Sequence, residues 1–131
     1  MRAAIFQFAP AFGEVAANVA RIARAARAVD AGLWVLPELA TTGYLFADRA
    51  ECQALAEPAT GPTLQALADL CRERSTSMVV GFAERFEEHL YNSAAFVSPD
   101  GVIAVYRKVH LFDRERLTFD PGPDPFRVAP L

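Results

Sequence analysis

Three short apolar runs, separated by segments of helical periodicity, restrict the fold of this chain more than any other feature of its sequence. The runs cover residues 2–8, 33–36 and 78–82. Short apolar runs bounded by proline, glycine or polar residues predict buried strands. Strands that alternate with helices are joined by right-handed crossovers into a mainly parallel sheet. The sequence therefore predicts an α/β fold in which helices cover the sheet.

The segments between these runs predict helices. From Gly13 to about Asp30, apolar residues recur at spacings of three and four, which is typical of an amphipathic helix. Residues 48–56 predict a short helix. Pro62 suits the first position of a longer one, whose apolar face includes Cys71.

The later part of the chain predicts a hairpin followed by irregular structure. Pro-Asp-Gly at 99–101 is a strong turn signal between two further strands, 90–98 and 102–107. A charged turn is expected at 84–89. Beyond His110 the closely spaced prolines argue against regular structure.

Composition narrows the class of protein. The chain has 131 residues, which predicts one domain, and 53% apolar with 22% charged residues is typical of a globular protein. A net charge of −3 argues against a nucleic-acid partner. No apolar run approaches the roughly 18 residues of a membrane span, so no membrane partner is expected. The N-terminal run resembles a strand more than a signal peptide, which predicts a cytoplasmic protein.

No motif indicates a cofactor or a metal. The two cysteines form no C-x-x-C pair and cannot build a disulfide framework. The two histidines, His89 and His110, lack metal-ligand spacing. Neither a G-x-G-x-x-G nor a Walker motif is present. We therefore expect no cofactor and no metal ion.

Two charged residues follow predicted strands, where open α/β sheets bind their ligands. Glu38 comes just after the strand at 33–36, and Lys108 directly follows the strand at 102–107. A carboxylate at this edge can transfer a proton, and an ammonium can stabilise an oxyanion. A solvated surface charge is the alternative for each residue taken alone.

Five segments give a more specific signal. They are AIFQFAP (4–10), LPELATTGY (36–44), LYNSA (90–94), YRKVHLF (106–112) and FDPG (119–122). In this order they resemble signature segments of the nitrilase superfamily, the carbon–nitrogen hydrolases. The resemblance extends over the whole chain and leans toward the amidase-like members.

The resemblance implies a fold and a set of site residues. The fold is an α-β-β-α sandwich, of which residues 1–131 are expected to form the N-terminal half. The family uses a Glu-Lys-Cys triad: Glu38 matches the general base, and Lys108 matches the residue that stabilises the tetrahedral intermediate. Glu115 is similar to a second glutamate that orients substrate and lysine. Tyr44, in the loop after the first glutamate, is a candidate substrate contact.

The family's nucleophilic cysteine lies a few dozen residues beyond the lysine, outside this chain. Cys52 and Cys71 both precede Lys108, and neither lies in a matching segment. We expect both to be structural and the 131-residue chain alone to be inactive. With its partner half it would hydrolyse a small-molecule amide, carbamoyl amine or nitrile through a thioester. The family also implies a homo-oligomer.

Two other functions are compatible with parts of the sequence. One is a truncated, non-catalytic fragment that acts only by association with another chain. The other uses Glu38 and Glu115 as a glycosidase-like carboxylate pair, which leaves Lys108 without a role. Three further expectations concern polar residues. The amide of Asn92 bonds to backbone, with support of the glutamate as the alternative. The charged clusters at 84–88 and 113–116 are solvated surface, Glu115 excepted.

Overall fold

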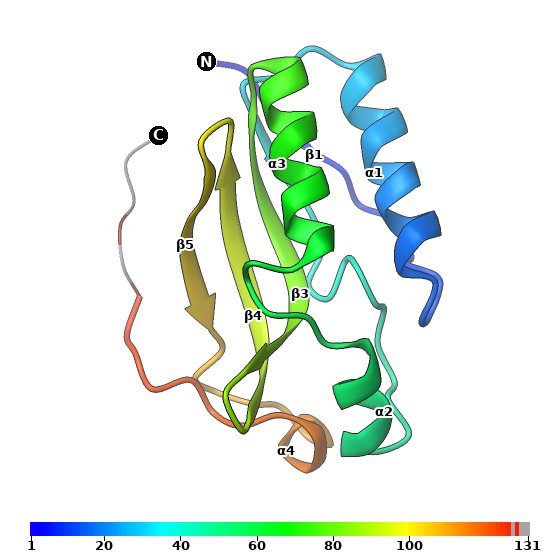
Figure 1. Cartoon of the computed structure of the whole chain (residues 1–131), viewed down its shortest axis with the longest axis vertical. Coiled ribbons are helices and arrows are strands. Elements are labelled where there is room, and N and C mark those ends of the chain that lie inside the picture. Colours follow the sequence, from blue (N-terminus) through cyan, green and yellow to red (C-terminus); the bar gives the residue numbers. More distant parts are fainter. Residues whose placement is uncertain (127, 129–131) are drawn as a thin grey trace.

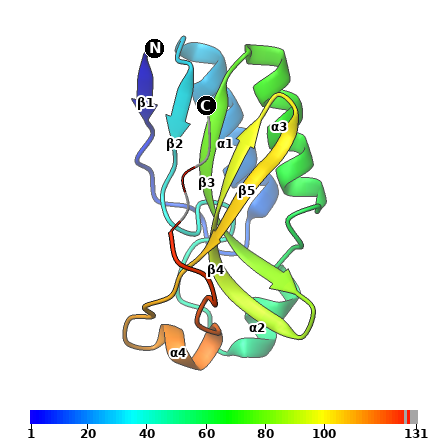
Figure 2. The ribbon, with the colours of Figure 1, turned by 90° about the vertical axis from the view of Figure 1, so that its left-hand side faces the viewer.

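The computed structural model describes residues 1–126 and 128. Within that part, five strands form a single sheet in the order β1-β2-β3-β4-β5 (Figures 1 and 2). The strands are β1 (Ala3–Ile5), β2 (Leu33–Val35), β3 (Ser77–Phe86), β4 (His89–Ser98) and β5 (Gly101–Arg107). Strands β1, β2 and β3 are parallel, whereas β4 is antiparallel to β3 and β5. This is the predicted α/β arrangement with an added hairpin.

Two long helices cover one face of the sheet (Figure 1). They are α1 (Val15–Ala28) and α3 (Pro62–Arg74), and their apolar faces form the main core with the sheet. Two short helices, α2 (Arg49–Leu55) and α4 (Glu115–Thr118), lie together beyond the end of the sheet. No described helix is long and apolar enough to cross a membrane.

The two faces of the sheet differ in what covers them. Met78, Val80 and Phe82 of β3 are at most 2% exposed and belong to the core under the helices. Because side chains alternate along a strand, Val79 and Gly81 point to the opposite face. Figure 2 shows that face, across which the chain after α4 runs back along the sheet. We call this the open face of the sheet, because α1 and α3 both cover the other face.

Some sequence predictions need correction. The turn expected at 84–89 is wrong, because β3 continues to Phe86 and only Glu87 and Glu88 form the turn. Glu84 is not solvated surface: it is 1% exposed and pairs with Arg107. The segment after His110 contains the short helix α4, which the prolines of that region obscured. Cys71 lies in the core as expected.

Candidate active site

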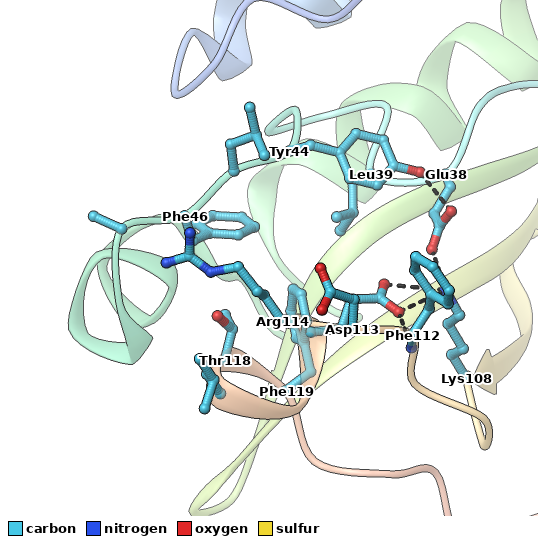
Figure 3. A pocket seen from close by; sticks show the side chains of 14 residues that line it. Glu38, Leu39, Tyr44, Phe46, Lys108, Phe112, Asp113, Arg114, Thr118 and Phe119 are labelled. Carbon is cyan, nitrogen blue, oxygen red and sulfur yellow. Dashed lines mark hydrogen bonds and ion pairs between the residues drawn. The ribbon is translucent and has the colours of Figure 1, made fainter.

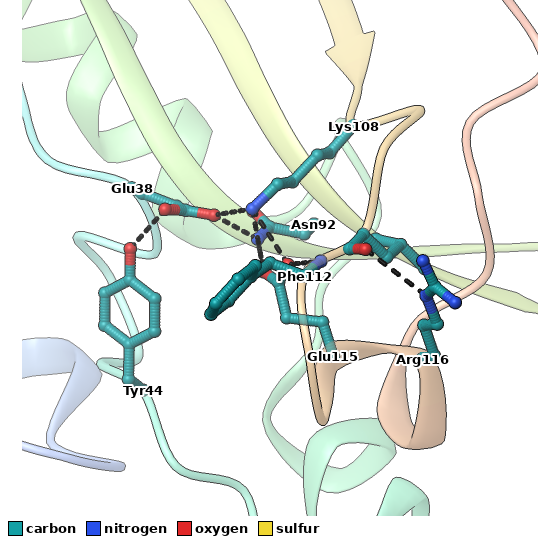
Figure 4. A network of polar contacts seen from close by, with 8 residues as sticks. Glu38, Tyr44, Asn92, Lys108, Phe112, Glu115 and Arg116 are labelled. Carbon is teal, nitrogen blue, oxygen red and sulfur yellow. Dashed lines mark hydrogen bonds and ion pairs between the residues drawn. The ribbon is translucent and has the colours of Figure 1, made fainter.

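Glu38 and Lys108 meet at one edge of the sheet, although 70 positions separate them in the sequence. Glu38 follows β2 and Lys108 follows β5, and these strands run in the same direction because β4 is antiparallel to both of its neighbours. Their carboxyl ends therefore lie at the same edge. The Nζ of Lys108 donates to Oε1 of Glu38 at 2.8 Å (Figure 4).

Glu115 supplies a second carboxylate to the same ammonium. It is the first residue of α4, and its Oε2 and Oε1 accept from Nζ of Lys108 at 2.8 and 3.0 Å. The backbone N–H of Phe112 also donates to Oε2 of Glu115 at 2.7 Å, which fixes the carboxylate relative to its own loop. Glu38, which follows β2, and Glu115, in α4, thus hold Lys108 from two different parts of the fold.

Asn92 joins the two carboxylates. Its Nδ2 donates to Oε1 of Glu38 at 2.5 Å and to Oε1 of Glu115 at 2.7 Å. The expectation that Asn92 bonds to backbone is wrong. Its side chain leaves β4 on the open face and is 3% exposed, so its amide must find buried partners, and these carboxylates are within reach.

Tyr44 binds the second carboxylate oxygen of Glu38. Its hydroxyl donates to Oε2 of Glu38 at 2.5 Å. The loop that carries Tyr44 is tied to the body of the protein by Asn18, whose Nδ2 donates to the backbone oxygen of Thr41 at 3.0 Å. Asn18 is fully buried, and the helical periodicity of its segment gave no sign of this role. Gly43 has a φ of 76° and its Cα packs against Phe12, which favours glycine there.

The electrostatics of this cluster fix its protonation states. Partial burial alone would raise the pKa of Glu38, but hydrogen bonds from Lys108, Tyr44 and Asn92 lower it below its ordinary value. Burial would lower the pKa of Lys108, but the hydrogen bonds that its ammonium donates to Glu115 and Glu38 raise it. Burial and the Glu38 carboxylate raise the pKa of Tyr44. At neutral pH the cluster therefore holds a carboxylate, an ammonium and a phenol.

Gly81 determines how closely Glu38 can approach the sheet. A Cβ at this position of β3 would lie 2.4 Å from the backbone oxygen of Pro37 and 2.6 Å from Cα of Glu38. Only glycine leaves room for the backbone of residues 37–39 to cross β3 here. Gly81 was not among the predicted site residues, although a glycine inside a buried strand signals a close backbone approach.

Asp120 holds α4, and with it Glu115, against the rest of the fold. Its Oδ2 accepts from Nη2 of Arg49 at 2.7 Å and from the backbone N–H of Leu90 at 3.0 Å, and lies 3.2 Å from Nδ1 of His89. Burial would raise the pKa of Asp120, but these contacts, chiefly that with Arg49, lower it. Asp120 thus links α2, the β3–β4 hairpin and the end of α4.

A cavity of about 390 Å³ opens beside the cluster (Figure 3). Glu38, Lys108 and Glu115 lie at one end, and Phe46 and Phe119 form part of the remaining wall. A second depression of about 320 Å³ lies over Gly81 on the open face of the sheet. Glu38 and Lys108 line both cavities, so they are accessible from two sides.

Comparison with known proteins assigns the family. The profile described as carbon-nitrogen hydrolase matches residues 2–131. This chain belongs to the carbon–nitrogen hydrolase family. The resemblance of its five segments is thereby confirmed.

Characterised carbon–nitrogen hydrolases similar to this chain include an amidase and a nitrilase. An (R)-stereoselective amidase from a Pseudomonas species is 40% identical over 124 residues, which are 93% of this chain and 44% of the relative. A nitrilase from Pyrococcus abyssi is 46% identical over 102 residues, 77% of this chain and 39% of the relative. The chain spans less than half the length of these relatives.

Solved structures of carbon–nitrogen hydrolases share its fold. The crystal structure of an N-terminal amidase matches with a TM-score of 0.86 at 26% identity, over 96% of this chain and 32% of that one. An amidase from Nesterenkonia sp. matches with a TM-score of 0.84 at 27% identity, over 100% of this chain and 51% of that one. The predicted nitrilase-type α/β fold is therefore confirmed.

Both cysteines of this carbon–nitrogen hydrolase chain lie inside apolar clusters. Cys71 packs in the main core, and Cys52 packs with Leu39 and Phe119 below the loop of the site. Both are fully buried, and burial raises the pKa of Cys52 to about 12 and that of Cys71 to about 11. Thiols of this kind stay protonated at neutral pH and are poor nucleophiles.

Metal ligation finds no support in the residues that the structure describes. Among residues 1–126 and 128, no three His, Cys, Asp or Glu side chains are grouped so that they could hold an ion. The ammonium of Lys108 is the positive charge that the two site carboxylates contact.

Proposed function

We propose that this protein hydrolyses a non-peptide carbon–nitrogen bond in a small-molecule amide, carbamoyl amine or nitrile. One observation carries the proposal: Nζ of Lys108 lies 2.8 Å from carboxylate oxygens of both Glu38 and Glu115, at the end of a cavity. The cluster offers a base beside a fixed positive charge, which is the pair that acyl transfer needs. The amidase and nitrilase relatives support the same chemistry.

In this proposal Glu38 is the general base. Its lowered pKa keeps it ionised at neutral pH, and about 39% of its side chain is exposed, so a thiol can reach it. The nucleophile is a cysteine outside these 131 residues, which gives its proton to Glu38. A thiol needs such a base because it is mostly protonated at neutral pH.

Lys108, Glu115 and Tyr44 have supporting roles. Lys108 donates to the substrate oxygen or nitrogen, on which negative charge develops when the thiolate attacks. Glu115 positions Lys108, because it accepts two hydrogen bonds from Nζ and is itself held by the backbone N–H of Phe112. Tyr44 contacts the substrate at the cavity and keeps Glu38 oriented.

For an amide, the steps balance with these groups alone. The thiolate sulfur bonds to the carbonyl carbon, and Lys108 stabilises the resulting oxyanion. The carbon–nitrogen bond breaks as protonated Glu38 returns its proton to the leaving nitrogen, which leaves a thioester and an amine. Glu38 then removes a proton from water, which attacks the thioester and releases the carboxylic acid. Proton return to sulfur restores the thiol.

The glycosidase alternative receives no support from this geometry. A carboxylate pair that cleaves a glycosidic bond must flank the sugar. Here a lysine ammonium and the Asn92 amide, each hydrogen-bonded to both carboxylates, lie between Glu38 and Glu115. Glu38 and Glu115 therefore share the same two hydrogen-bond partners, Lys108 and Asn92.

The test uses the protein expressed from its complete reading frame, with release of ammonia from primary amides and nitriles as the assay. We expect hydrolysis, a thioester adduct on one cysteine in intact-mass spectra, and large losses in Glu38→Gln and Lys108→Ala. Replacement of the labelled cysteine by alanine should abolish both signals. Hydrolysis that survives Glu38→Gln would contradict the proposal. A folded protein with no turnover and no adduct would favour the non-catalytic fragment.

We also propose that the protein is a cytoplasmic homo-oligomer. In the residues that the structure describes, the helices cover one face of the sheet and leave side chains such as Val35 partly exposed on the other. Apolar surface of this kind favours association. Sedimentation velocity at several concentrations tests the assembly, and a monomer throughout would contradict it.

A further inference from the structure

Beyond the charged cluster, much of the wall of the site cavity is apolar. Its floor contains Leu39 and Phe119, which are 1% and 4% exposed. Phe46 packs edge-on against Phe119, with ring centroids 5.7 Å apart. Figure 3 shows Phe46 and Phe119 on the side of the cavity away from Glu38 and Lys108. The cavity thus has one reactive end and one apolar end.

Exposed apolar side chains gather at the mouth of the same cavity. Leu45, Phe112 and Leu117 are 92%, 79% and 70% exposed, and all three line it. Large apolar side chains left in water together mark a binding surface. They come from two separate segments, the loop after Glu38 and the loop with α4, so their convergence is not a consequence of local sequence.

Backbone strain is concentrated in the same walls. Leu39, Leu45 and Asp113 have φ values of 47°, 71° and 47°, in the left-handed region, which is uncommon for the two bulky leucines, whereas aspartate adopts it more readily. All three line the cavity. Strained backbone of this kind is typical of ligand sites, where the surrounding structure imposes it.

The charges of the cavity disfavour an anionic ligand. Glu38 and Glu115 against Lys108 leave the reactive end with an excess of negative charge, which repels an anionic group. Asp113 and Arg114, which also line the cavity, carry opposite charges. The volume of about 390 Å³ lies within the range of roughly 300–1,000 Å³ that is typical of small-molecule sites.

We propose that this cavity binds the acyl chain of the substrate and selects uncharged apolar chains, branched aliphatic or aromatic, with Phe112 and Leu117 as specificity-determining residues. This inference rests on the proposed function. In a primary amide the leaving group is ammonia, so the acyl chain is the part of the substrate left to fill the cavity. A chain that reaches Phe112 and Leu117 removes their side chains from water.

The test compares four primary amides that share the leaving group ammonia: acetamide, isobutyramide, 3-phenylpropionamide and the anionic succinamic acid. With the protein from the complete reading frame, kcat/KM for 3-phenylpropionamide should exceed that for succinamic acid at least about thirtyfold. Ligand-observed NMR with the same amides measures occupancy of the cavity without turnover. It should show the same order of binding.

Variants at the cavity mouth test which residues determine the preference for 3-phenylpropionamide. Phe112→Gln and Leu117→Gln should each lower kcat/KM for 3-phenylpropionamide about tenfold, through KM, and should lower kcat/KM for acetamide by a clearly smaller factor. Ile103→Gln is the matched control, because Ile103 is an exposed apolar residue of β5 that does not line the cavity. Ile103→Gln should change kcat/KM for neither substrate.

The outcomes separate the two proposals. Selective binding of 3-phenylpropionamide without ammonia release would support the acyl site and overturn the hydrolase. Equal binding and equal kcat/KM across the four amides would overturn the acyl site and leave the hydrolase intact. A change of sedimentation coefficient in Phe112→Gln and Leu117→Gln, with the amide preference unchanged, would identify the mouth as a protein contact and overturn the inference.

Discussion

Two carboxylate–cation clusters lie back to back on strands β4 and β5. Ser93 and Arg107 face the helices and hold Glu84, and with it they form the inner cluster. Their neighbours in the chain, Asn92 and Lys108, face the other way and belong to the outer cluster with the two site glutamates. The same pair of strands therefore builds two ionic groups with different properties.

The inner cluster is matched and enclosed. The carboxylate of Glu84 accepts from Nε and Nη2 of Arg107 at 2.8 and 2.7 Å and from Oγ of Ser93 at 2.7 Å. The guanidinium also lies over the rings of Phe86 and Tyr91, 4.1 and 4.8 Å from their centroids. One negative charge meets one positive charge, and every strong contact is made within the protein.

The outer cluster is unmatched and open. Two carboxylates share one ammonium, and the side chains of Glu38 and Lys108 are 39% and 29% exposed. Excess acceptors around one donor leave a carboxylate that can take a proton from another molecule. From this comparison we expect the inner cluster to serve stability and the outer cluster to serve the proposed chemistry.

The largest expected effect is on the inner cluster. Arg107→Met leaves the Glu84 carboxylate buried without its partner, and this should lower the free energy of unfolding by about 3–5 kcal/mol. Urea denaturation measures this loss in the free energy of unfolding. The double variant Glu84→Met/Arg107→Met removes both charges and should recover most of the loss. A double variant as unstable as Arg107→Met would show that packing, and not charge, is what Arg107 contributes.

Replacement of the next residue, Lys108, by methionine should reduce activity strongly and stability only slightly. Lys108→Met should reduce kcat/KM for amide hydrolysis about 10²–10³-fold, because the donor to the developing oxyanion is lost. The partly exposed ion pairs of Lys108 contribute little to stability, so the free energy of unfolding should change by less than about 1 kcal/mol. Comparable loss of stability in both methionine variants would remove the distinction between the clusters.

Gly81→Ala should affect the outer cluster through the backbone. The added Cβ meets the backbone of Pro37 and Glu38, so Glu38 must move away from Lys108, at a cost of about 1–3 kcal/mol in stability. Displacement of the base by about 1 Å should lower kcat on the order of a hundredfold. In the matched variant Gly32→Ala, the Cβ meets the flexible side chain of Met1, and activity should not change. Full activity in Gly81→Ala would contradict the assigned position of Glu38.

The smallest expected effect concerns pH. A base with a lowered pKa stays ionised as pH falls, so kcat/KM should decline only when pH approaches that lowered value. Tyr44→Phe removes a hydrogen bond that lowers the pKa of Glu38 and should move the acid limb upward by less than about one pH unit. Tyr91→Phe, next to the inner cluster, should leave the limb in place. An acid limb that moves downward in Tyr44→Phe would contradict the assignment of Glu38 as base.

The ionisation of Glu38 also links pH to stability, with a definite sign. Its pKa in the folded protein lies below the ordinary carboxyl value. The stabilisation it gives is therefore present above the unfolded pKa and is lost as pH falls through the folded one.

Most strands and the longer helices could be predicted from the sequence, because local patterns of apolar and turn residues determine them. The strand ends placed Glu38 and Lys108 at one edge, and the topology brings them into contact. Glu115 came from family resemblance alone, since α4 is a helix of only four residues that lies just before a proline-rich segment. The two buried polar residues Asn92 and Glu84 were misjudged for one reason: burial depends on which face of the sheet a residue occupies.

A signal for Glu84 was nevertheless present. It continues the alternation of Met78, Val80 and Phe82, which are all buried, and so falls at an inward position of β3. A charge at an inward position predicts a partner on a neighbouring strand, here Arg107. Asn92 could not be found in this way, because its partners come from loops whose course depends on tertiary packing.

The long sequence separation between Glu38 and Lys108 has a consequence for how the protein folds. Their hydrogen bond joins residues 70 positions apart, and the bond from Asn92 to Glu38 joins residues 54 apart. Contacts of such high order form slowly, because a large loop must close before they contribute. The site can therefore assemble only after β2 to β5 have found their register. During synthesis, the Glu38 carboxylate lacks its hydrogen bonds with Asn92 and Lys108 until the ribosome has released the chain through Lys108.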